Sequence, residues 1–334
     1  MGEKSRLKKV VFFTDLNKLN DALNNFNIES FSGEKIPIKL HMGEKNNKYF
    51  LKPDLAKLIV DELKKVNADP FLFDTTVAYS GMRSKKNTYL KLTKIHGFTE
   101  KEVGCKVKID DNGAKVTIEN RDYEVANTLF NSTHIFGLTH VKGHIATGMG
   151  GAIKNFGMGG VTKETKIKMH HGSRPIYNKD ACTHCGVCAE VCPFDAIKVK
   201  NNNWELNMKS CFGCGVCVDL CEIKALTYKD ADFQFVLACA AQACVKDKNV
   251  IYFNEVKRIA NSCDCDSTAN QIICPDIGYL VSDDPVAIDK ASLDLINDVK
   301  GDIFKKVNHV SPLKQIKFGE EIGLGLSSYQ LIEL

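Results

Sequence analysis

The chain has 334 residues, of which 44% are hydrophobic and 26% are charged, a composition typical of a soluble globular protein with more than one small domain. No apolar run is long enough to span a membrane, and the net charge is only +4, so we expect neither a membrane nor a nucleic-acid partner. The 14 cysteines include two tight runs, a pattern typical of metal ligation in a reducing compartment. We therefore expect a cytoplasmic protein, from an anaerobe.

The first 120 residues alternate between strand and helix patterns. Short apolar runs predict buried strands at 10–16, 36–42 and 71–79. Apolar residues at helical spacing predict helices at 52–66, where Pro53 is tolerated in the first turn, and at 87–98. Residues 106–110 and 114–119 flank the turn sequence Asp111-Asn112-Gly113, which predicts a β-hairpin.

Residues 134–160 form a glycine-rich segment that also carries histidines and lysines. Glycine lets backbone amides approach an anion, and a helix that begins near Gly151 would direct its positive end toward one. We expect an anion site at Gly148, Gly150, Gly151 and Lys154. The catalytic candidates are His140, Lys142 and His144, because histidine can transfer protons or bind a metal and lysine can fix charge. The alternative is a turn-rich connection, and the spacing matches no nucleotide-binding loop.

Two cysteine runs, 182–193 and 211–222, repeat the same spacing 29 residues apart. A cubane cluster needs one thiolate per iron, and in two-cluster ferredoxins the fourth cysteine of each run ligates the other cluster. The first expected [4Fe–4S] cluster takes Cys182, Cys185, Cys188 and Cys221. The second takes Cys211, Cys214, Cys217 and Cys192. Zinc is the alternative metal, but the full repeat favours iron–sulfur clusters.

The two runs differ in the residue that follows them. Pro193 follows the first run, whereas Glu222 follows the second and would place a negative charge beside the first cluster. We therefore expect the first cluster to have the lower reduction potential. The repeat predicts a small inserted two-cluster ferredoxin domain at 173–230.

The C-terminal part returns to the alternating pattern. Strands are predicted at 249–256 and 277–282, and a helix at 283–299 with Asp283 or Asp284 as its N-cap. Together with the N-terminal elements they predict an α/β domain with a mostly parallel sheet, made of residues 1–172 and 231–334. Ligand sites in such sheets lie at the carboxyl ends of the strands.

Cys263 and Cys265 stand two residues apart in the sequence Cys-Asp-Cys-Asp. Two thiols this close predict an additional metal site or a redox dithiol, and a buried pair without function is the alternative. Further ligand candidates are His140, His144, His170 and His171. By contrast, Cys239 and Cys244 lie in an apolar helical pattern and are expected in the core, as is Cys105.

Several of these segments resemble the DUF362 family of iron–sulfur proteins. The resemblance rests on the segment 74–98, the glycine-rich stretch at 140–160, the sequences at 168–175 and 263–266, and the segment 275–296, with a ferredoxin-like stretch between them. It implies an α/β domain with an inserted ferredoxin and no defined reaction. It also indicates His140, Lys142, His144, Cys263 and Cys265 as site residues.

These patterns support three hypotheses about function. The first is an oxidoreductase that moves single electrons through two clusters to a substrate or metal site in the α/β domain. The second is an electron-transfer adapter, similar to a ferredoxin, that docks a partner enzyme. The third is a protein of metal or cofactor assembly. The partners that we expect are a redox partner protein and a small-molecule substrate.

Overall fold

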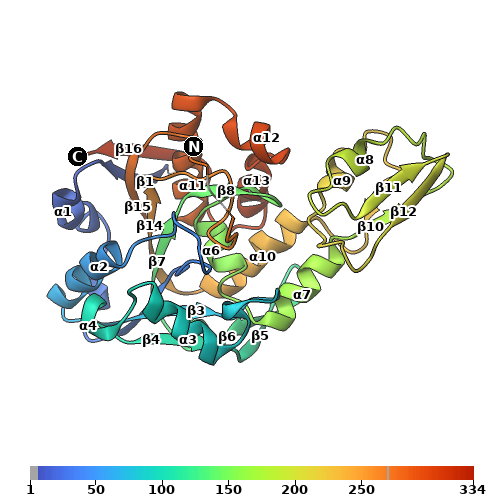
Figure 1. The fold of residues 1–334 in the computed structure, drawn as a ribbon. Helices are drawn as coiled ribbons and strands as arrows, with labels where there is room; N and C mark the ends of the chain where they lie inside the picture. Colours follow the sequence, from blue (N-terminus) through green and yellow to red (C-terminus); the bar gives the residue numbers. More distant parts are fainter. Residues whose placement is uncertain (1–6, 269–270) are drawn as a thin grey trace.

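A mixed eight-stranded sheet forms the centre of the computed structural model, which describes residues 7–268 and 271–334 (Figure 1). Its strands, in spatial order, are β16 (Tyr329–Glu333), β1 (Lys8–Phe13), β15 (Gly278–Ser282), β14 (Asn249–Val256), β7 (His134–His140), β2 (Lys35–Lys39), β3 (Asp69–Thr75) and β4 (Val107–Asp110). Five of the seven neighbouring pairs are parallel, and β15 is antiparallel to both of its neighbours. The expected mostly parallel α/β sheet is confirmed.

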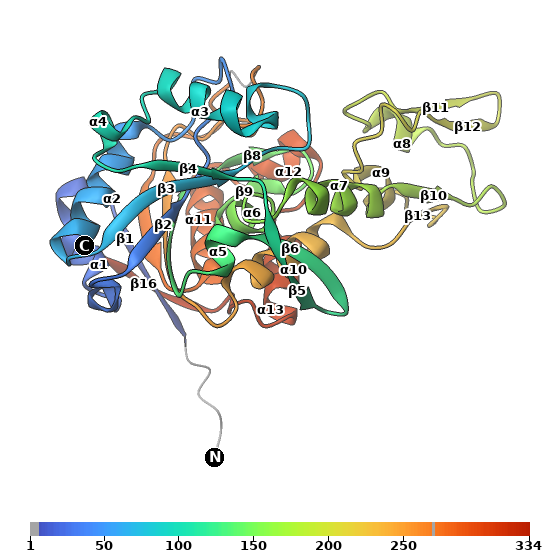
Figure 2. The same cartoon turned by 90° about the horizontal axis from the view of Figure 1, so that it is seen from below.

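Helices cover both faces of this sheet (Figure 2). One face carries α1 (Leu19–Leu23), α2 (Pro53–Lys65) and α3 (Lys86–Ile95), with α4 (Glu100–Val103) packed on α2. The other carries α6 (Ala152–Gly157), α10 (Phe233–Val245), α11 (Pro285–Lys300) and α13 (Leu313–Glu321). The remaining helices of the body are α5 (Asn127–Phe130), α7 (Lys163–Gly172) and α12 (Ile303–Asn308).

Local sequence signals explain several helix boundaries. Pro53 is the first residue of α2, and Asp284 caps α11 by accepting hydrogen bonds from the amides of Val286 and Ala287. Cys239 and Cys244 are buried in α10, and Cys105 is buried just before β4. Among the described residues, no helix is both long enough and apolar enough to cross a bilayer.

The hairpin predicted around Asp111-Asn112-Gly113 is wrong. Residues 107–110 form β4, which pairs in parallel with β3, while β5 (Gly113–Ile118) pairs with β6 (Arg121–Ala126). The tight turn lies at Glu119 and Asn120, whose φ angles are 47° and 57°. A two-residue hairpin turn between such strands requires positive φ angles at its central residues. Glu119 and Asn120 both adopt them, so the turn contains no glycine.

The segment with the two cysteine runs projects from the body as a lobe (Figures 1 and 2). Strand β10 (Pro175–Tyr177) pairs with β13 (Leu226–Tyr228) at the two ends of the segment, and β11 (Ile197–Lys200) pairs with β12 (Asn203–Leu206). Each cysteine run contains one short helix, α8 (Val187–Glu190) or α9 (Val216–Asp219), and each begins after a glycine in the left-handed conformation. The sequence repeat is therefore also a structural repeat.

Candidate functional site

The site is built where four parallel strands end. Because β14, β7, β2 and β3 run in the same direction, the segments that follow them meet at one edge of the sheet. These segments, with α6 and α7, enclose a cavity of about 110 Å³. Its wall includes Lys39 from β2, Asp74 from β3, His140 from β7 and Cys265 from the loop after β14.

Asp74 is the centre of one ionic cluster in this wall. Its carboxylate accepts from Lys39 Nζ at 2.9 Å and Arg83 at 3.0 Å, and also from the Tyr89 hydroxyl. Burial opposes the negative charge, but Lys39 and Arg83 outweigh it and lower the pKa of Asp74. Arg83 also contacts Nε2 of His41, whose pKa is lowered well below its usual value by burial and then by Arg83.

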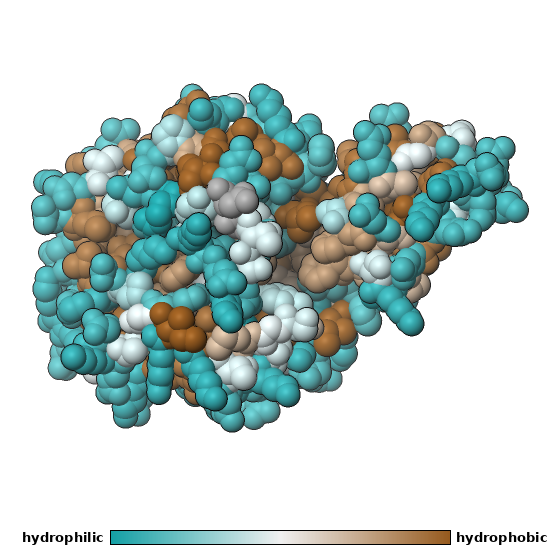
Figure 3. All heavy atoms as spheres, viewed as in Figure 1, coloured by the Kyte–Doolittle hydropathy of each residue, from teal (hydrophilic) through white to brown (hydrophobic). Residues whose placement is uncertain are grey.

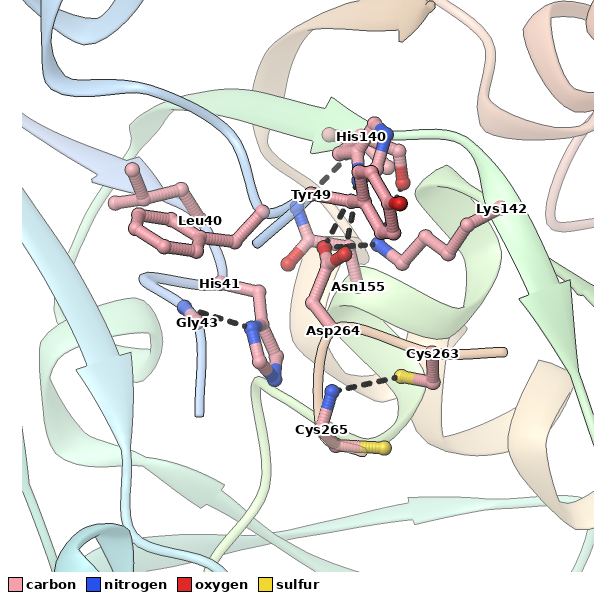
Figure 4. Close-up of polar contacts among 12 residues, drawn as sticks. Leu40, His41, Gly43, Tyr49, His140, Lys142, Asn155, Cys263, Asp264 and Cys265 are labelled. Carbon is pink, nitrogen blue, oxygen red and sulfur yellow. Dashed lines mark hydrogen bonds and ion pairs between the residues drawn. The ribbon is translucent and has the colours of Figure 1, made fainter. Parts of the chain in front are cut away.

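Asp264 is the centre of a second ionic cluster, on the loop after β14. It accepts from Nδ1 of His140 at 2.9 Å and from Lys142 Nζ at 3.1 Å (Figure 4). Nε2 of His140 lies 2.9 Å from the carbonyl oxygen of Lys257, so both ring nitrogens face acceptors. Burial raises the pKa of Asp264, but His140 and Lys142 outweigh it and hold the pKa well below its usual range.

Cys263 and Cys265 lie on the other side of Asp264, next to each other (Figure 4). The amide of Cys265 donates to Cys263 Sγ at 3.4 Å, and Lys154 Nζ donates to the same sulfur at 3.1 Å. A side-chain hydrogen bond from the Cys265 thiol lowers the pKa of Cys263 against burial, and Lys154 and Lys142 add to this. The two cysteines in turn raise the pKa of Lys154 against the effect of its burial.

His144 joins the two cysteines. It lies in β8 (Lys142–His144), which pairs with β9 (Gly148–Gly150), and its ring nitrogen and the two sulfurs lie within 4.8 Å of one another. Of the other histidines expected as ligands, His140 is bound by Asp264, and His170 stacks on Phe233 at a ring separation of 4.6 Å. His171 is exposed. Among the described residues, only this one histidine forms a compact ligand group with the cysteines.

The glycine-rich segment contributes differently from what its sequence suggests. Gly150, Gly151 and Lys154 lie on the cavity wall, whereas Gly148 packs against the carbonyl of Val310. Two amides at the start of α6, those of residues 152 and 153, bind the carboxylate of Asp289 at 2.7 and 2.9 Å. The carboxylate of Asp289 therefore occupies the start of α6. Of the four residues predicted to bind an anion, Lys154 is the charged one, and it lies on the cavity wall.

Sequence reasoning missed several residues of the cavity wall, among them Lys39, Asp74, Arg83 and Lys166. None was identified as a site residue, although Asp74 and Arg83 lie in the segment 74–98 that resembles the family. Lys39 and Asp74, however, stand in or at the end of apolar strands, where charged side chains are rare unless they are paired. That placement is the signal that could have identified them.

Two further cavities lie in the lobe, and each is lined by four cysteines. One is lined by Cys182, Cys185, Cys188 and Cys221. The other is lined by Cys192, Cys211, Cys214 and Cys217. Phe212 lines both this second cavity and the cavity at the sheet edge, and its ring contacts His170 at a centroid distance of 4.1 Å. Figure 3 shows hydrophobic residues gathered where the lobe meets the body.

Comparisons with known proteins give a family and two remote structural likenesses. The model of a family described as "Domain of unknown function (DUF362)" matches residues 36–294. No curated protein matches the chain. The lactate racemase apoprotein from Thermoanaerobacterium thermosaccharolyticum is 12% identical with a TM-score of 0.40, over 77% of this chain and 52% of that chain. A protein from Thermotoga maritima is 9% identical with a TM-score of 0.41, over 92% of this chain and 59% of that one. The chain thus spans little more than half of either structure, and likeness at this level carries no argument about function.

Proposed function

The chain belongs to the DUF362 family, and we propose that it passes single electrons through two [4Fe–4S] clusters to a small-molecule site at the edge of its sheet. Such a protein is an oxidoreductase with its own ferredoxin-type relay. The proposal rests on residues of this chain, because the family name assigns no reaction.

The cysteine residues of the lobe fit two clusters. Each lobe cavity is lined by one of the two sets of four cysteines that the crossed ligand pattern predicts. All 14 cysteines are free, so none is used in a disulfide. The lobe's hydrophobic cluster has four buried side chains, at Ile197, Cys217, Val218 and Leu226, and small domains with so few buried side chains often gain stability from metals or disulfides. When bound, the clusters would supply one-electron storage and transfer.

The position of Phe212 is the observation that carries the proposal. Its side chain forms part of the wall of both the second cysteine cavity and the sheet-edge cavity. One side chain therefore separates the expected second cluster from the site. Val187 and Ile223 line the first cysteine cavity and are exposed, which favours this end of the lobe as the face for a redox partner.

Charge at the sheet-edge cavity favours an anionic substrate. Five basic side chains line it, Lys39, Arg83, Lys142, Lys154 and Lys166; Asp74 is the one carboxylate on the described wall, and Asp264 behind it pairs with Lys142. Burial lowers the pKa of Lys166 to about 7, so this group can give or take a proton near neutral pH. A carboxylate or phosphate group is the substrate chemistry that such a wall would bind.

Two measurements test the proposal. Anaerobically purified protein should contain about eight irons and eight sulfides per chain, as two cubanes require. The chemically reduced protein should then be reoxidised faster by a small anionic acceptor than by a cationic acceptor of equal potential. Phe212→Leu should slow the reaction with the anionic acceptor, whereas Phe194→Leu should not, because Phe194 lines only the cysteine cavity. Protein without iron–sulfur clusters, or reoxidation at the same rate in both variants, would overturn it.

A further inference from the structure

We propose that His144, Cys263 and Cys265 bind one borderline-soft divalent transition-metal ion, such as Zn²⁺, at the wall of the sheet-edge cavity. This inference deepens the proposed function and rests on it for the metal's role. Metal binding itself can be measured without any reaction.

The three donor atoms already lie close together. One ring nitrogen and two sulfurs fall within 4.8 Å of one another, although they come from β8 and from a loop more than 110 residues later. Zinc–ligand bonds of about 2.0–2.3 Å place ligand atoms about 3.3–3.8 Å apart in a tetrahedron. To bind the metal, the three donor atoms would have to move closer together by on the order of one ångström, which side-chain adjustment can supply.

The donor set selects the class of metal. Two thiolates and one imidazole suit zinc and similar ions, whereas magnesium and calcium require oxygen ligands. Asp264 lies between the two cysteines in sequence, but its carboxylate is bound by His140 and Lys142. The protein therefore offers three ligands, and His144 and Cys265 are also part of the cavity wall. A fourth coordination position would be open toward the cavity, as in catalytic zinc sites.

The neighbours of the three ligands support metal binding. Lys154 donates to Cys263 Sγ at 3.1 Å, and this hydrogen bond would hold the sulfur in place as a metal ligand. Nδ1 of His144 lies 3.0 Å from Thr147 Oγ1, which donates onward to the carbonyl of Met149 at 2.8 Å. The amide of Ala146 approaches the same Nδ1 at 3.2 Å, so the metal-free ring carries its proton on Nε2.

The test is zinc binding by the anaerobic, cluster-containing protein. Equilibrium dialysis against Zn²⁺ with elemental analysis should find one zinc per chain and an iron content that does not change. X-ray absorption at the zinc edge should find two sulfur ligands at about 2.3 Å together with nitrogen or oxygen ligands. The zinc edge reports this site separately from iron, so the absence of clusters would count against the proposed function and not against this inference.

Matched variants complete the test. Cys263→Ser with Cys265→Ser, and separately His144→Gln, should weaken zinc binding at least tenfold. Cys105→Ser with Cys274→Ser should leave it unchanged, because these cysteines are buried outside the ligand group. Wild-type protein without zinc, zinc without two sulfur ligands, or equal zinc binding in the Cys263/Cys265 variant would overturn the inference. The absorption spectrum of the wild type decides the matter even where a variant fails to fold.

Discussion

Lys166 should titrate near neutral pH. Below that pH its charged form should destabilise the fold. Its buried ammonium group donates to Thr75 Oγ1 at 2.6 Å and to the carbonyl of Thr76, and both acceptors are neutral. Among the described residues, no carboxylate forms a salt bridge with it. Burial lowers the pKa from 10.5 to about 7; Asp74 partly opposes this, and Arg83 and Lys39 reinforce it.

The magnitude follows from the pKa difference. A fall from 10.5 to about 7, at about 1.4 kcal/mol per pH unit, means that folding disfavours the charged form by on the order of 5 kcal/mol. Below pH 7 the lysine is protonated in both states, so the full penalty is present. Between about pH 7 and 10.5 unfolding takes up a proton, and wild-type stability rises with pH.

Lys166→Met removes the penalty but leaves two acceptors without their donor, at about 1–2 kcal/mol each. We expect the variant to be more stable than the wild type by about 2 kcal/mol at pH 6, and the gain to disappear by about pH 9, since the wild type regains about 1.4 kcal/mol per pH unit. Urea unfolding followed by circular dichroism at both pH values measures this difference.

An NMR titration of protein labelled with [ε-¹³C]lysine measures the pKa directly, and the Lys166→Met spectrum identifies the resonance. Lys154 is the internal control, because the two cysteine sulfurs raise its pKa. A Lys166 midpoint near pH 10, or a stability difference that stays the same at pH 6 and pH 9, would refute the reasoning.

Three further predictions concern other parts of the molecule. Asp264→Asn should destabilise the fold by about 3–5 kcal/mol in chemical unfolding, because it leaves buried His140 and Lys142 without their anion, whereas the half-buried Asp266→Asn should cost far less. Gly151→Ala should lower stability by about 1–3 kcal/mol, since a Cβ there would lie 2.3 Å from the Asp289 carboxylate; a wild-type melting temperature would contradict this. Glu222→Gln should raise the reduction potential of the first cluster in an anaerobic redox titration, and an identical titration curve would disprove the effect of this carboxylate.

Much of the fold could be predicted because its signals are local. Continuous apolar runs between helical segments indicate buried parallel strands, and Asp284 and Pro53 mark helix starts that the structure contains. The hairpin failed because a turn signal cannot decide which strand a neighbour pairs with. Residues 107–110 gain burial beside β3, and the turn formed instead at Glu119 and Asn120, a pair with no glycine.

The site could be predicted only in pieces. The histidine and the cysteine pair each carry a recognisable pattern, but their meeting depends on the sheet order, which places β7 beside β14. Asp74 and Arg83 form their ion pair without any motif, through a short loop after β3. Asp289 binds the amides of α6 because α11 packs against α6, and no local sequence pattern predicts that packing.

The orientation of the lobe follows from a difference between its two repeats. Where the first run has Thr183 and His184 between its first two cysteines, the second has Phe212 and Gly213. Gly213 has a φ of +77°, and a Cβ there would lie 1.8 Å from the carbonyl oxygen of His170, so only glycine lets this run approach α7 so closely. Phe212 is thereby placed in the wall of the sheet-edge cavity. Phe212 and Gly213 thus make a symmetric cysteine repeat directional, because they place the second cysteine cavity, and not the first, next to the site.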